Sequence, residues 1–234
     1  MRNIIRLCIA SSVVACVAAP AAAVQSVTLT SVGIYSPGHV DVTTAGVTKS
    51  EYAVPLTITA TSRGIPFDAL GFCIDLAHNI YVGLGSQLAT SLAYHVAPLT
   101  TDSFGNPLSA KQVREIGGLA TLGFGIAKGS ATDKPAQLAA IQQAIWTIEY
   151  PASTFVATGD YVPAQATYAA QFVSEAPRLR GFARTIVADN GATQGFITNI
   201  GGVPEPAMWV EMIAGLGLVG AISRRRRTLD SVAA

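Results

Sequence analysis

Cys73 lies in the apolar segment Leu70-Gly71-Phe72-Cys73-Ile74-Asp75-Leu76, where its thiol could act as a nucleophile. The other two cysteines, Cys8 and Cys16, fall in a predicted signal peptide, so Cys73 stands alone once that peptide is removed. An intramolecular disulfide is then impossible, although exported proteins meet conditions that favour disulfides. Such a thiol is buried and inert, bonded between chains, or committed to other chemistry.

A second segment, Ile141-Gln142-Gln143-Ala144-Ile145-Trp146, lies in a predicted helix later in the chain. Together with Phe72-Cys73-Ile74-Asp75, it resembles the paired motifs of bacterial thioester domains found in surface adhesins, in which an aromatic-cysteine strand meets a T-Q-x-A-I-W helix. The resemblance implies that the Cys73 sulfur attacks the carboxamide of Gln142, ammonia leaves, and an internal thioester remains. Positions 144 to 146 match the motif, Gln143 takes its variable position, and Ile141 departs from its threonine.

A strand docked on a helix can hold a sulfur and a carboxamide together, which favours their reaction by proximity. A wall formed by Phe72, Trp146 and the neighbouring Ala144 and Ile145 would shield the bond from water. A lysine amine or a hydroxyl on a partner would then take the acyl group once. We therefore expect adhesion without enzymatic turnover and without a cofactor or metal. The alternative is an unreacted Cys73, because a lone cysteine is often a small buried hydrophobe.

Other constellations are weaker. A thiol hydrolase needs a base within hydrogen-bond reach of the sulfur, but on a continuing strand His78 would lie far from Cys73 and face the other side. His39 and His95 are isolated, so three dispersed histidines and one cysteine predict no metal site. The carboxylates of Asp75, Glu149 and Asp160 could serve glycoside chemistry only if the fold brought them together, and nothing in the sequence indicates this.

The N-terminus has the pattern of a secretory signal peptide. Arg2 and Arg6 precede the apolar run 7–19, and the small residues 21–23 suit signal peptidase, so we predict cleavage after Ala23. Lipoprotein processing at Cys16 is the alternative, since Val13-Val14-Ala15-Cys16 passes for a lipobox.

The C-terminal end combines three features in order, which are Pro204-Glu205-Pro206, the apolar run 207–222, and the arginines Arg224, Arg225, Arg226 and Arg227. As a helix the run is about 24 Å long, against about 30 Å of membrane hydrocarbon, and it contains Glu211. The arginines would stop transfer on the cytoplasmic side. An ordinary single-pass anchor is the simple alternative.

With Trp209, this order resembles a PEP-CTERM sorting signal of the PEPxxWA type, with Val210 in place of the usual alanine. The resemblance implies export by Sec in a Gram-negative bacterium that produces extracellular polysaccharide. It also implies an inner-membrane intermediate and cleavage near Pro204-Glu205-Pro206 by an exosortase-type membrane protease. The remaining residues, 228–234, would form a short cytoplasmic tail.

The charge of the predicted mature region 24–203 excludes one class of partner. Six of the 15 Lys and Arg and three of the 14 Asp and Glu lie in the two terminal signals, leaving nine basic and eleven acidic residues and a charge near −2. Because no basic run remains, nucleic acid is not expected as a partner.

The pattern of apolar residues predicts strands first and helices later. Residues 27–30, 40–42, 52–60 and 70–76 alternate or are β-branched, with turns at 36–39 and 62–64. A capping box at Ser109 and Gln112 begins one predicted helix, and Gly117-Gly118 and Gly123-Phe124-Gly125 are expected to end or kink it.

Asp133 and Pro135 begin a second helix, which Pro151 ends. Leu138, Ile141, Ile145 and Ile148 form its core-facing stripe, with Gln142 and Trp146 along the edge. A weaker helix follows at 164–175, and strands return at 185–187 and 195–200.

We expect an α+β fold in which a strand-rich, sandwich- or barrel-like part packs on a small helical subdomain, between terminal hydrophobic targeting helices. The predicted organisation is a signal peptide at 1–23, a thioester-type extracellular domain at 24–203, and a sorting signal at 204–227. The predicted function is covalent adhesion at the cell surface or in the extracellular matrix. The alternative is a non-reactive structural or carbohydrate-binding matrix protein that shares only the sorting signal.

Overall fold

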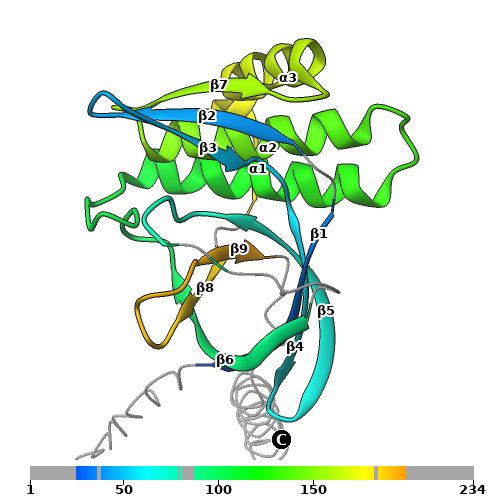
Figure 1. Ribbon diagram of the computed structural model, residues 1–234, viewed down its shortest axis with the longest axis vertical. Coiled ribbons are helices and arrows are strands. Elements are labelled where there is room, and N and C mark those ends of the chain that lie inside the picture. Colours follow the sequence, from blue (N-terminus) through cyan, green and yellow to red (C-terminus); the bar gives the residue numbers. More distant parts are fainter. Residues whose placement is uncertain (1–24, 36–37, 79, 81–86, 182–183, 199–234) are drawn as a thin grey trace, which may run out of the picture.

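The computed structural model describes residues 25–35, 38–78, 80, 87–181 and 184–198. It confirms a strand-rich α+β fold, in which a six-stranded closed barrel lies below three helices and a three-stranded sheet (Figure 1). The predicted signal peptide, sorting signal and terminal hydrophobic helices lie outside these residues. None of the helices in the described part is both long and apolar enough to cross a membrane.

The barrel strands follow the order β1-β4-β5-β9-β8-β6, and all their pairings are antiparallel. Alternate side chains of β1 and β4 point inward, so residues such as Val27, Leu29 and Ile58 fill the interior. Arg63 and Gly64, both with positive φ, make the predicted turn between β4 and β5. The bounds are β1 Ser26–Ile34, β4 Leu56–Ser62, β5 Ile65–Cys73, β6 Gln87–Pro98, β8 Arg184–Ala188 and β9 Phe196–Thr198.

The second sheet has the order β3-β2-β7, formed by β2 (His39–Thr44), β3 (Val47–Tyr52) and β7 (Thr154–Thr158). The sequence pattern missed β6, β7 and all of β3 except Tyr52, and it extended the strand that ends near Ala60 back to Tyr52. In the structure β3 ends at Tyr52 and β4 begins at Leu56. The chain therefore leaves one sheet and enters the other at the segment that contains Pro55, which has no N–H to donate to a ladder.

The helices are α1 (Ala110–Lys128), α2 (Lys134–Glu149) and α3 (Val162–Glu175), followed by the 3-10 turn η1 (Ala176–Arg178). The predicted capping box is confirmed, because the Ser109 side chain accepts from the Gln112 N–H while Gln112 Oε1 accepts from the Ser109 N–H. Asp133 precedes α2 but makes no side-chain cap. Its carboxylate instead accepts from the side chains of Gln137 and Tyr168.

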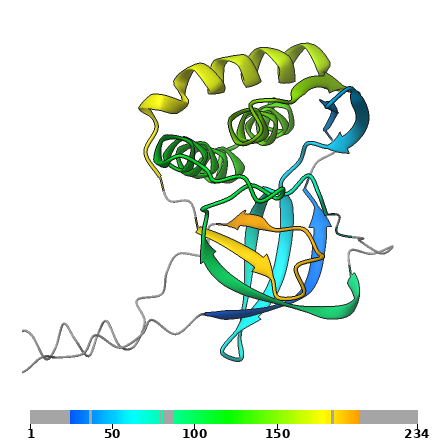
Figure 2. The same cartoon turned by 90° about the vertical axis from the view of Figure 1, so that its left-hand side faces the viewer.

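The α2 helix is the central element of the upper layer, between α1 and α3, as the end-on view in Figure 2 shows. Its predicted stripe is confirmed for Leu138, Ile141 and Ile145, which are fully buried in the core between the helices and the barrel. The three-stranded sheet covers another face of α2. Gln142 and Trp146, along the edge of the stripe, are consequently buried as well.

The glycines of α1 neither end nor kink it, contrary to the sequence prediction. The helix runs unbroken through them because they allow close packing. A Cβ on Gly123 would lie 2.4 Å from the Phe72 ring, and one on Gly118 would lie 2.6 Å from the Leu179 side chain. These positions need a residue without a side chain.

Candidate functional site

Cys73 is the last residue of β5, where the barrel meets α2. Its register partner across the sheet is Phe196 of β9, and the Ile74 N–H donates to the carbonyl of Gly195 at 3.2 Å. The cysteine is only 3% exposed. The strand pairing therefore holds a buried thiol beside the residues that lead into β9.

Gln142 contacts the backbone of Cys73. The Cys73 N–H donates to Gln142 Oε1 at 2.8 Å, and Gln142 Nε2 donates to the Cys73 carbonyl at 2.7 Å. The neighbouring strand β4 pairs with β5 only as far as Gly71. The carboxamide of Gln142 thus acts as a substitute peptide group that satisfies the Cys73 backbone after β4 has ended.

Gln194, which the sequence analysis did not single out, contacts the sulfur itself. Its Nε2 lies 2.5 Å from Cys73 Sγ and 3.2 Å from the Asp75 carbonyl. The Gln194 carbonyl also accepts a bond from Tyr94 Oη at 2.9 Å. Gln194 precedes β9 by two residues, so the β5–β9 register brings it to the thiol. The sequence does show a glutamine just before the predicted strand 195–200. It does not show how that strand is aligned with residues 70–76, and this alignment is what brings Gln194 to the thiol.

The thiol of Cys73 is held in its neutral form. Burial raises its pKa well above the usual range, and the negative charges of Asp75, Glu149 and Glu51 act in the same direction. A backbone hydrogen bond with Asp75 opposes the shift only in part. The protonated Sγ donates to the Asp75 carbonyl at 3.1 Å. A thiolate nucleophile for turnover chemistry is therefore disfavoured here.

The residues predicted to shield a thioester lie on two sides of β5. Trp146 packs in the same cluster as Cys73, together with Val40, Val42 and Tyr150, and its ring stacks on Phe155. By contrast, Phe72, Ala144 and Ile145 belong to the core between the helices and the barrel. Phe72 and Cys73 are neighbours on a strand, so their side chains point to opposite faces.

A polar network surrounds the turn after Cys73. Tyr150 Oη donates to the Ile74 carbonyl at 2.9 Å and lies 2.7 Å from Ser103 Oγ, which accepts from the Leu76 N–H. Glu149, 1% exposed, has no hydrogen-bond partner for either carboxylate oxygen among the described residues. Burial raises its pKa well above the ordinary value, and the nearby carboxylates of Asp102 and Asp75 raise it further.

Among the described residues, none of the other constellations considered from the sequence places a side-chain base in hydrogen-bond contact with the sulfur. His78 Nδ1 lies 2.9 Å from Asp75 Oδ2, His95 is paired with Asp189, and the His39 ring packs on Tyr52. Asp160 is exposed while Glu149 is buried. Within the described residues, no group of three or more His, Cys, Asp or Glu is arranged to hold a metal ion.

Comparison of the chain with models of protein families, with curated proteins and with solved structures finds no match. The functional interpretation consequently depends on the geometry of the site itself.

Proposed function

We propose that Cys73 forms an internal thioester with Gln194, and that the protein uses this bond once to attach covalently to a partner. The contact between Cys73 Sγ and Gln194 Nε2 carries the proposal. It changes the acyl donor that the motif resemblance implied, because the Gln142 carboxamide is engaged with the Cys73 backbone at both of its ends.

The reaction balances without a cofactor. The Cys73 sulfur attacks Cδ of Gln194, a C–S bond forms, and the C–N bond of the carboxamide breaks. The thiol proton leaves with the amide nitrogen as ammonia. A neutral thiol is a weak nucleophile, but a sulfur already in contact with the reacting group gains the large advantage of an intramolecular reaction. The thioester has to form only once in each molecule, so a slow reaction during maturation is sufficient.

Gln142 is a positioning residue in this proposal. Its two bonds to the Cys73 backbone fix the end of β5, while the pairing of Cys73 with Phe196 fixes the approach of Gln194. Trp146 closes the buried side of the thiol and excludes water. The site can then store an electrophile until a nucleophile reaches it.

We propose in addition that the protein acts outside the cell. The signal-peptide pattern at 1–23 and the PEP-CTERM-like order at 204–227 support export by Sec and processing by an exosortase-type protease. In this account, Pro204, Glu205, Pro206 and Trp209 form the recognition motif. Deleting the tail should retain the protein in the cell fraction or release it unprocessed, and normal processing without Pro204-Glu205-Pro206 would contradict this part of the proposal.

Intact mass of the purified mature protein tests the thioester. We expect a deficit of one ammonia that disappears in Cys73→Ala and Gln194→Ala and persists in Gln171→Ala, which changes an exposed glutamine of α3. Methylamine should replace the lost ammonia, which turns the deficit into a mass one methylene above that of the unreacted protein and leaves a methyl label on one glutamine. Peptide mapping then identifies that residue as 194 or 142.

The possible outcomes separate the alternatives. A label on Gln142 would return the acyl donor to the residue that the motif resemblance implied. A protein of full mass with a freely alkylated Cys73 would exclude the thioester and leave a non-reactive matrix component.

A further inference from the structure

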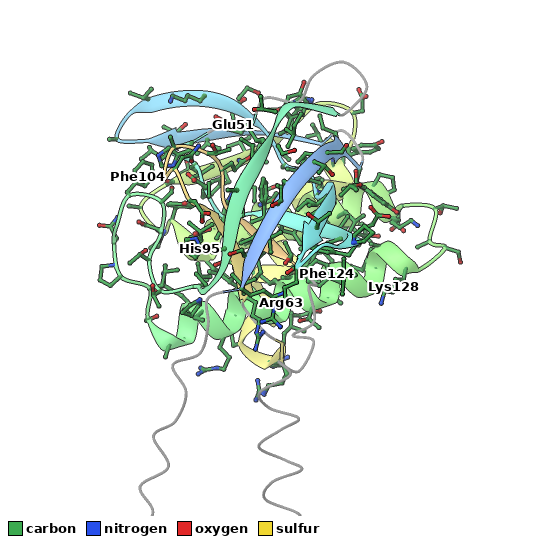
Figure 3. The ribbon with its side chains drawn as sticks, turned by 90° about the horizontal axis from the view of Figure 1, so that it is seen from below. Glu51, Arg63, His95, Phe104, Phe124 and Lys128 are labelled. Atoms are coloured by element: carbon green, nitrogen blue, oxygen red, sulfur yellow. The ribbon has the colours of Figure 1, made fainter. Side chains whose placement is uncertain are left out.

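A surface hollow of about 280 Å³ lies beside the Cys73 cluster, between the β2–β3 hairpin and the turns that follow β5 and β6. Its apolar walls are Val42, Val47, Leu76 and Phe104, and its charged groups are Lys49 and Glu51. Figure 3 shows Glu51 and Phe104 on the same side of the molecule, away from Phe124 and Lys128. The volume is slightly below the range of about 300–1,000 Å³ that is usual for small-molecule sites, so it suits a single side chain better than a polymer.

The floor of this hollow is the outer cover of the candidate thioester. Val42 and Leu76 both line the hollow and pack in the cluster that contains Cys73. Leu76 is three residues beyond Cys73 and only partly buried, and its N–H is held by Ser103. Leu76 therefore contacts the hollow on one side and the Cys73 cluster on the other, and a nucleophile that enters here would approach the sulfur past its side chain.

Glu51 faces this hollow because β3 alternates. Val47, Lys49 and Glu51 project from the same face of the strand, and the register pairs them with Thr44, Val42 and Val40 of β2. Val40 is fully buried against the Cys73 cluster. The Cβ atoms of residues directly opposite in an antiparallel pair lie about 5 Å apart. The Glu51 side chain therefore leaves β3 at the edge of that cluster.

The Glu51 carboxylate is available. It is half-buried, and among the described residues it makes no hydrogen bond or ion pair shorter than 4 Å. Desolvation raises its pKa, against the opposing effect of Lys49, as expected of a carboxylate with an apolar wall on one side. A hollow with apolar walls and a carboxylate on one side is complementary to a methylene chain with a cationic head.

We propose that this hollow receives a lysine side chain of a partner protein and that Glu51 selects for its amine. The inference rests on the thioester proposed above. The stem of the lysine lies between Phe104 and Val47, and Glu51 pairs with the ammonium group and takes one proton from it. The free amine attacks Cδ of residue 194, the C–S bond breaks, an amide forms, and the second amine proton passes to the Cys73 sulfur. Glu51 then returns its proton to water.

Lys49 limits the affinity of the hollow for cations. It lies on the same face of β3 but is exposed, nearer the turn at Ala45-Gly46. Its charge opposes a second ammonium in the hollow and favours the charged form of Glu51. Removing this charge should therefore speed the reaction with cationic amines, and removing the charge of Glu51 should slow it.

The test uses the purified, thioester-bearing protein and two probes, n-butylamine and hydroxylamine. Butylamine is cationic at neutral pH, whereas hydroxylamine reacts there as a neutral nucleophile. Intact mass follows adduct formation with time. Glu51→Gln should slow the butylamine reaction on the order of a hundredfold, the lower end of what a positioned proton acceptor supplies, and should leave the hydroxylamine rate nearly unchanged. Lys49→Gln should accelerate butylamine only.

Asp41→Asn is the matched control, because Asp41 projects from the opposite face of the same hairpin, in register with Ser50 and Val156. It makes the same change of charge and should alter neither rate. If Glu51→Gln retains the ammonia deficit and reacts with butylamine at the wild-type rate, the inference about the hollow is wrong while the thioester stands. If the wild-type protein has its full mass, the proposed function fails, and this inference fails with it.

Discussion

Gln142 and Cys73 are joined by two hydrogen bonds of 2.8 and 2.7 Å between a side-chain carboxamide and a strand backbone. The pair links α2 to the end of β5, so the helix and the barrel share one buried polar contact. The sulfur of Cys73 points elsewhere, toward Gln194 and Asp75. The same cysteine thus uses one glutamine for its backbone and another for its thiol.

Replacing Gln142 should destabilise the fold whether or not a thioester forms. Gln142→Ala leaves the buried N–H and C=O of Cys73 without partners, and each unsatisfied group costs about 1–3 kcal/mol. We expect a loss of about 2–4 kcal/mol in the free energy of unfolding, measured with urea. Gln171→Ala, at an exposed site, should stay within about 0.5 kcal/mol of wild type. Equal midpoints for the two variants would contradict the structural role.

Glu149 should make the protein less stable as the pH rises. Its pKa is raised in the folded state, so the folded protein binds more protons than the unfolded chain once the pH exceeds the unfolded pKa of about 4.3. The stability associated with Glu149 is complete below that value and is lost as the pH rises toward the folded pKa. Glu149→Gln should flatten this dependence and stabilise the protein at neutral pH.

Urea unfolding of both proteins at acid and neutral pH measures the effect of Glu149. A shallow slope should remain in the variant, because the pKa of Glu51 is also raised by burial. A steeper loss of stability in Glu149→Gln than in wild type is the result that excludes this role.

Gly123 and Gly125, two glycines of the same helix, should respond to alanine in opposite ways. A Cβ at Gly123 meets the Phe72 ring at 2.4 Å and Ile141 at 3.0 Å, whereas nothing lies within 4 Å of one at Gly125. Gly123→Ala should lose about 1–3 kcal/mol from overpacking, and Gly125→Ala should gain up to about 1 kcal/mol from helix propensity. Thermal unfolding of the two variants gives the comparison directly, and a shift of the same sign in both would rule out the packing argument.

Leu76→Ala should shorten the lifetime of the proposed thioester. Leu76 lines the hollow and packs against the Cys73 cluster, so trimming it should let water approach the acyl carbon. The ammonia deficit in the intact mass should disappear faster on storage, with a free thiol and a glutamic acid as products. Ile65→Ala, at a 69% exposed position at the start of β5 and outside the hollow, serves as the control. Identical lifetimes in the two variants would show that water does not enter through Leu76.

Local signals predicted much of the fold because they depend on neighbours in the chain. The capping box at Ser109, the stripe of Leu138, Ile141 and Ile145, and the turn at Arg63-Gly64 are all short-range patterns. Strand β6 was missed although Leu92, Tyr94 and Val96 alternate along it and pack on the barrel core. Strands β3 and β7 were missed because they are short and their pairing with β2 specifies them. The glycines of α1 were misread for a related reason: Phe72 and Leu179, which require them, are distant in sequence.

The sequence by itself determined that Cys73 lies in an apolar strand, that Gln142 and Trp146 share a helix, and that the part between the predicted terminal signals is an α+β chain. Only the tertiary structure distinguished Gln142, which bonds the Cys73 backbone, from Gln194, which contacts the Cys73 sulfur. Their carboxamides are chemically identical, so nothing local separates them. The end of β4 at Gly71 leaves the Cys73 backbone open to Gln142, and the register of Cys73 with Phe196 brings Gln194 to the sulfur.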